Sequence, residues 1–181
     1  MESTKLPTAR ELEKLPMRAV VAYASRTARR LSADLRGVVP DELLDKMFET
    51  LDPVSKNYLI RGSDEASALN AARDIIAAYA AAPSDLQSLK KFLIVFSILD
   101  AAFAAMGTVV AAVDPDTICH RMKSVAKAAE KAARHIRVLE PAAVATATAA
   151  ARQDYELLLR QYGEHNKAII GGPIDCFDDD S

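Results

Sequence analysis

Apolar residues recur at helical spacing in the first long segment of the chain. They are Met17, Val20, Val21, Ala24, Ala28, Leu31 and Leu35. On a helical wheel these positions share one face, and five arginines lie mostly on the opposite face. The arginines are Arg18, Arg26, Arg29, Arg30 and Arg36. The pattern predicts an amphipathic helix that begins after Pro16, ends near Gly37 and turns its arginine face outward.

Prolines, glycines and capping residues divide the rest of the chain. The Thr8–Glu11 spacing is that of a capping box and predicts a short helix before Pro16. Further helices are predicted over about residues 41–51 with an extension to 60, 64–82, 85–113, 116–139 and 141–162. No alternating strand pattern appears, so no sheet is predicted.

The last two predicted helices also have distinct faces. In the segment 116–139 the positions expected inward are Ile118, Met122, Val125, Ala129, Ala133 and Ile136, and those expected outward are His120, Lys123, Lys127, Lys131 and Arg134. In the segment 141–162 the inward positions are Val144, Ala147, Ala151, Tyr155, Leu158 and Tyr162. Such stripes are typical of helices packed against a common core.

Alanine gathers in the blocks 66–82, 101–112, 126–133 and 142–151. Alanine has the highest helix propensity, and its small side chain lets helix axes approach closely. Short linkers favour mainly antiparallel neighbours. The sequence therefore predicts an all-α, single compact bundle of about six main helices over residues 1–167, followed by an irregular acidic tail rich in Gly, Pro and Asp over 168–181.

The apolar run from Phe92 to Val113 is long enough to cross a bilayer. Asp100 inside the run opposes insertion, so a central bundle helix surrounded by other helices is the favoured interpretation and no membrane span is expected. A buried carboxylate needs a partner. Asp100 is therefore expected to face a gap at the edge of the bundle or to pair with an arginine of the first long helix or of the segment 116–139; the functional alternative is a ligand or proton site.

The net charge of −2 hides strong blocks. Residues 1–40 and 117–167 each carry +4, whereas residues 41–116 carry −6 and the last fourteen carry −4. Such blocks predict complementary packing faces or binding surfaces. One specific hypothesis is that Arg26 or Arg30 pairs with Asp154 or Glu156, which would tie the first long helix to the last.

Motifs that carry catalysis are missing from the chain. It has no P-loop, dinucleotide-binding glycine pattern, His-Glu-x-x-His, Cys-x-x-Cys or Glu-x-x-His. We therefore predict no catalytic residue, no metal site and no cofactor. Cys119 and Cys176 are too few for a disulfide scaffold, and the N-terminus has no apolar signal region, so a cytoplasmic protein is expected.

Two stretches near the ends of the chain stand out together. The first runs from Leu15-Pro16 through residues 19–24 to Arg26 and 28–30. The second comprises residues 151–155, Leu157-Leu158 and the late segment 172–175. Together they resemble an uncharacterised family of bacterial alanine-rich helical proteins, a resemblance that implies an α-helical fold and brings no activity, cofactor or site residues.

The favoured function is a non-enzymatic helical protein that binds a partner protein, as a regulatory or immunity-type module does. The expected contact surfaces are the arginine face, formed by Arg18, Arg26, Arg29, Arg30 and Arg36, and the acidic tail. The alternative is a small-ligand-binding or enzymatic bundle with a pocket beside the central helix, near Asp100, Tyr79 and His135. Nucleic-acid binding through the basic faces of the first long helix and the segment 116–139 is ranked third.

Overall fold

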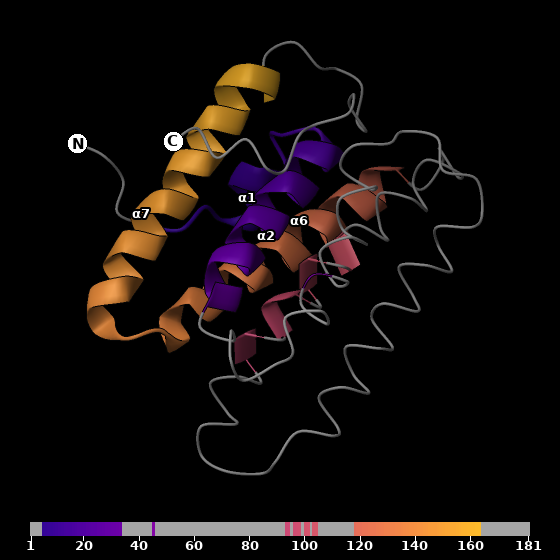
Figure 1. The fold of residues 1–181 in the computed structure, drawn as a ribbon. Coiled ribbons are helices and arrows are strands. Elements are labelled where there is room, and N and C mark those ends of the chain that lie inside the picture. The colour runs from indigo at the N-terminus through magenta and orange to yellow at the C-terminus, as the bar shows by residue number, and fades with distance from the viewer. Residues whose placement is uncertain are drawn as a thin grey trace.

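The computed structural model describes residues 5–33, 45 and 118–163, together with 93, 94, 96–98, 100, 101, 103 and 104. Within these ranges the chain is all-α and forms no strand. The helices are α1 (Ala9–Leu12), α2 (Met17–Ser32), α6 (Ile118–Arg134) and α7 (Pro141–Leu158). A 3₁₀ turn, η3 (His135–Val138), follows α6, and a π turn, η4 (Leu159–Gly163), follows α7. The three long helices pack together (Figure 1).

The helix starts follow from local sequence, as predicted. The Thr8 hydroxyl accepts a hydrogen bond from the backbone N–H of Glu11, and the Glu11 carboxylate accepts one from the N–H of Thr8 at 2.9 Å. This capping box satisfies two donors that the first turn of α1 would otherwise leave unpaired. Pro16 immediately precedes α2, and Pro141 occupies the first turn of α7, where its missing N–H costs nothing.

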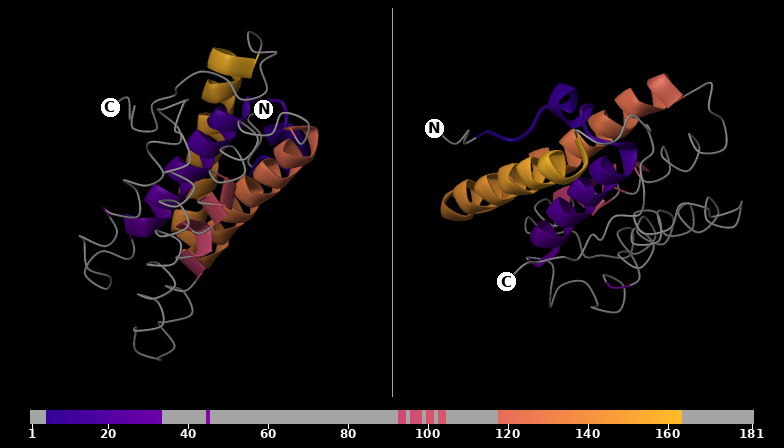
Figure 2. Two further views of the ribbon diagram at one scale, coloured as in Figure 1. Left: turned by 90° about the vertical axis from the view of Figure 1, so that its right-hand side faces the viewer. Right: turned by 90° about the horizontal axis from the view of Figure 1, so that it is seen from above.

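Helix α2 is the central element of the described body. It contacts both α6 and α7, and Figure 1 shows it between them, whereas Figure 2 gives the same three helices from two further sides. Every residue from Met17 to Ala28 is buried. The prediction that the segment 92–113 is surrounded on all sides is wrong for its described part, because Phe96 and Phe103 are 38% and 55% exposed.

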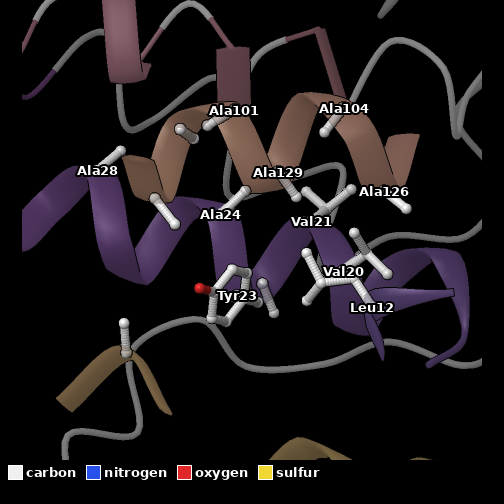
Figure 3. Close-up of a cluster of buried hydrophobic side chains, with 14 of the residues drawn as sticks. Leu12, Val20, Val21, Tyr23, Ala24, Ala28, Ala101, Ala104, Ala126 and Ala129 are labelled. Atoms are coloured by element: carbon white, nitrogen blue, oxygen red, sulfur yellow. The ribbon is translucent and has the colours of Figure 1, made fainter. Parts of the chain in front are cut away.

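The core forms where small side chains from three segments meet. Ala24 and Ala28 of α2 face Ala126 and Ala129 of α6, with Ala101 and Ala104 alongside (Figure 3). Larger side chains close the cluster, namely Leu12, Val20, Val21 and Tyr23. Alanines at such contacts allow helix axes to lie near the short end of the usual 8–10 Å range.

The predicted faces of α6 are confirmed wherever their side chains are described. The predicted inward residues Val125, Ala129 and Ala133 are buried and Met122 is half-buried, whereas the exposed residues are His120, Lys123, Lys127, Lys131 and Arg134. Ile136, also predicted inward, is buried in η3. Among the predicted inward residues of the segment 141–162, Ala151, Tyr155 and Leu158 are buried, and Val144, Ala147 and Tyr162 are half-buried. The hydrophobic period alone was therefore sufficient to orient these two helices.

Several predictions lie outside the described residues. They are the helices over 41–60 and 64–82, the end of the first long helix near Gly37, the tail 168–181, and Tyr79. Among the described helices, none combines the length and the hydropathy that a bilayer crossing requires.

Candidate functional site

Two arginines of α2 pair with one aspartate of α7. Arg30 donates a hydrogen bond through Nη1 to Oδ2 of Asp154, and Nη1 of Arg26 lies 3.6 Å from Oδ1 of the same carboxylate. The Arg26 and Asp154 side chains are both less than a tenth exposed. This arrangement confirms the hypothesis that an ion pair ties the first long helix to the last.

The expectation that the arginine face points outward is wrong. Arg18 and Arg26 are only 3% and 7% exposed, and Arg29 and Arg30 are half-buried. For Arg26 and Arg30 the physical reason is that Asp154 brings a countercharge from a distant helix, which allows these side chains to be covered. The binding role predicted for the stripe as a whole is untested, and Arg36 lies outside the described residues.

Tyr23 lies beside this ion pair in the core. Its side chain is fully buried, and its hydroxyl forms no hydrogen bond within the described part of the chain. Burial raises the pKa of the Tyr23 phenol well above its usual value, and the negative charge of Asp154 raises it further. The hydroxyl therefore stays protonated and neutral while the protein is folded.

A second charged cluster fastens α1 to α7. Arg152 lies 2.7 Å from the Glu11 carboxylate and 3.0 Å from that of Glu156, and the Tyr155 hydroxyl donates to the carbonyl of Glu11 at 3.3 Å. Burial raises the pKa of the Glu11 carboxyl, but hydrogen bonds from the Thr8 backbone N–H and from Arg152 outweigh it and hold that pKa below its usual value. Both clusters are engaged in joining helices.

Asp100 meets His135, not an arginine. Nε2 of His135 lies 3.3 Å from Oδ2 of Asp100, and both side chains are less than a fifth exposed. Asp100 sits on the helical segment 93–104, and His135 begins η3 at the end of α6. Two of the three residues that sequence analysis assigned to a pocket beside the central helix are thus brought together, while the expected arginine partner is not found among the described residues.

Two aromatic side chains flank Asp100 on the same side of its helix. Phe96, Asp100 and Phe103 follow the i, i+4, i+7 spacing that aligns residues along one face. We call these three residues the aromatic face. The opposite side of the segment is buried and includes Ile94, Ile98 and Ala101. Phe96 and Phe103 were not among the site residues predicted from the sequence. Their seven-residue spacing within the apolar run does indicate that they share one side of a helix.

The described side chains give little support to catalysis. Ser97 is buried and donates its hydroxyl proton to the carbonyl of Ala132 at 2.8 Å, so this hydroxyl is already engaged. In the described ranges no Ser, Thr or Cys side chain is hydrogen-bonded to a histidine ring, and no group of three or more His, Cys, Asp or Glu residues is placed to hold a metal ion. Asp100 can orient the imidazole of His135, as a general base requires. An oriented imidazole alone is not sufficient for a reaction.

No protein-family model, no curated protein and no solved structure matches this chain. The resemblance to alanine-rich bacterial proteins therefore stays a prediction, and the evidence about function is the arrangement of the described side chains.

Proposed function

We propose that the protein is a non-enzymatic helical module that binds a partner protein, and that its contact surface is the aromatic face formed by Phe96, Asp100 and Phe103. We propose also that the whole chain forms one bundle of about six helices, of which the described helices are part. The observation that carries the binding proposal is the exposure of two phenylalanines on one side of one helix, at 38% and 55%.

Exposed phenylalanines at helical spacing favour contact with another protein. Aromatic residues are enriched at the buried centres of interfaces, where each removes a large apolar area from water. The part of each ring that stays exposed along this helix forgoes that stabilisation. A partner that covers both rings restores it.

The spacing of the two rings suggests how a partner would bind. Residues at i and i+7 act as anchors when an amphipathic helix lies in an apolar groove. The Asp100 carboxylate, paired with His135, lies between these anchors and provides a polar contact that sets orientation. A partner with an apolar groove and a hydrogen-bond donor near its middle fits this surface.

The proposal is tested by affinity capture from native lysate at low salt with two double variants. Phe96→Ala/Phe103→Ala removes both rings, whereas Lys123→Ala/Lys131→Ala truncates two exposed side chains of α6 and is the matched control. We expect a protein that wild type and the lysine variant capture in equal amounts, and that the phenylalanine variant loses. Circular dichroism and urea unfolding check that both variants are folded.

Capture of the same proteins by all three forms, or of none by wild type, would contradict the proposal. If wild type binds its own tagged copy through these rings, the contact joins copies of this chain and the proposed hetero-partner is wrong. Sedimentation of wild type and the phenylalanine variant distinguishes that case.

The Asp100–His135 pair favours a second candidate, a small-ligand or enzymatic site beside this helix. Its test is a thermal-shift screen against a panel of small metabolites. A ligand that stabilises wild type and the phenylalanine double variant, but neither Asp100→Asn nor His135→Gln, would support this candidate. If every compound that stabilises wild type also stabilises Asp100→Asn and His135→Gln, this second candidate is wrong.

A further inference from the structure

A groove of about 530 Å³ lies apart from the three residues of the aromatic face. It runs between the segment 5–8, the C-terminal end of α6 with η3, and the first half of α7. Its volume falls within the range of roughly 300–1,000 Å³ that small-molecule sites occupy. It shares no residue with the aromatic face, so the function proposed above does not account for it.

Three of the four charged side chains that line this groove are cationic. Lys5, Arg134 and Arg137 contribute three positive charges, and Glu130 contributes the one carboxylate, so the lining carries a net charge of +2. Glu130 already pairs with Arg134 at 2.8 Å. The excess charge therefore belongs to Lys5 and Arg137, and neither of them forms an ion pair with any described residue.

The end of a helix does not by itself explain this cluster. Basic side chains at a helix C-terminus are stabilised by the partial negative charge there, which is a sufficient reason for Arg134 and Arg137. Lys5 comes from a separate segment of the chain, ahead of α1, and still faces the same groove. Lys5 and Arg137, the two cations left after Arg134 pairs with Glu130, therefore come from two segments and face one groove, where an anion would be attracted to both.

The groove also has an apolar part and a hydroxyl. Leu6 and Val144 belong to its lining, as does Thr148, which adds a hydroxyl from α7. A ligand that fits must therefore combine an anionic group with an apolar body. Small molecules of that kind bury their apolar part while a few polar groups fix the orientation.

We propose that this groove binds a small organic phosphate, namely a phosphate monoester that carries an apolar or aromatic body. Such a group bears close to two negative charges near neutral pH, which matches the net charge of the lining. The planar guanidinium of Arg137 can donate two parallel hydrogen bonds to phosphate oxygens. Lys5 acts as a point charge on the same group, and Val144 contacts the apolar body.

Phenyl phosphate is the probe for this proposal, titrated into the isotope-labelled full chain and followed by amide NMR. We expect saturable shifts of the amides of Arg137 and Thr148. Arg137→Ala should weaken binding by about tenfold to a hundredfold, as expected when a charge-assisted hydrogen bond is lost. Lys123→Ala removes the same charge from an exposed position outside the groove and should leave the affinity unchanged.

Three outcomes would overturn the proposal. They are the absence of saturable shifts, equal weakening by Arg137→Ala and Lys123→Ala, and terephthalate binding at least as tightly as phenyl phosphate. Arg137→Lys separates bidentate recognition from charge alone, and we expect an affinity between those of wild type and Arg137→Ala. Urea unfolding of each variant shows that the groove itself is intact.

Discussion

The guanidinium of Arg26 and the carboxylate of Asp154 lie 3.6 Å apart, and each side chain is less than a tenth exposed. These residues belong to α2 and α7, which a large part of the chain separates. A buried charge is stable only with a partner and further hydrogen bonds, and the hydrogen bond from Arg30 to the same carboxylate supplies one. The pair therefore fixes how the first and last long helices dock.

Removing the charge of Asp154 should strongly destabilise the fold. Asp154→Asn keeps the shape of the side chain but removes the negative charge that Arg26 and Arg30 both contact, so we expect a loss of about 3–5 kcal/mol in the free energy of unfolding. Urea unfolding followed by circular dichroism measures it. Glu130→Gln is the control, since its i,i+4 pair with the exposed Arg134 is worth about 0.3–0.5 kcal/mol. Equal losses in the two variants would show that the buried pair is unimportant.

Acid should weaken the contact between α1 and α7 through Glu11. Its pKa is lowered in the folded protein from the ordinary 4.5, so the ionised carboxyl stabilises the fold above that pH. As the pH falls through the folded pKa, the carboxyl is protonated and this stabilisation is lost. We expect the stability difference between wild type and Glu11→Gln to shrink below pH 4.5, as urea unfolding at a series of pH values would show. Glu13→Gln, an exposed neighbour, controls for the loss of one charge. Parallel curves for wild type and Glu11→Gln would contradict the prediction.

The Tyr23 hydroxyl should contribute nothing favourable to stability. It is buried without a hydrogen-bond partner among the described residues, and burying such a group costs free energy. Tyr23→Phe should therefore unfold at an equal or higher urea concentration, with a gain of up to about 1–3 kcal/mol. A clear loss of stability would reveal a partner for this hydroxyl.

Alkaline pH should affect wild type more than Tyr23→Phe. The folded pKa of Tyr23 is raised above the ordinary 10.0, so its ionisation leaves the stability of the fold unchanged below that pH. Above pH 10.0 the unfolded chain loses this proton while the folded protein keeps it, and stability falls. Unfolding curves measured on either side of that pH should diverge between the two proteins, and identical pH profiles would contradict the assignment.

Close packing of alanines should make the interface between α2 and α6 intolerant of larger side chains. Ala129 is fully buried there, so Ala129→Leu should cost about 1–3 kcal/mol through overpacking. Ala149→Leu is the matched control, because Ala149 is exposed on α7 and leucine has nearly the same helix propensity. Thermal unfolding of both variants measures the difference. Similar melting temperatures would mean that the alanine contact is loose.

Local sequence determined where the described helices begin and which sides of α6 and α7 face the core. Pro16, Pro141 and the Thr8–Glu11 capping box act within one helical turn, so their effects can be predicted without a tertiary structure. The apolar stripes on α6 and α7 can also be predicted from sequence alone, because a periodic apolar face is buried whichever helix covers it.

Only the tertiary structure shows what covers the arginine side of α2 and that Asp100 pairs with His135. Periodicity shows that the arginines oppose the apolar stripe, but whether water or another helix meets them depends on a distant countercharge such as Asp154. The charge blocks suggested that pair without showing that it is buried. In the same way, the sequence of the segment 92–113 cannot indicate which of its apolar sides is covered. Docking against the core buries Ile94 and Ile98 and leaves Phe96 and Phe103 exposed. A single helix determines its own faces, and only the neighbours it meets determine which of them reach solvent.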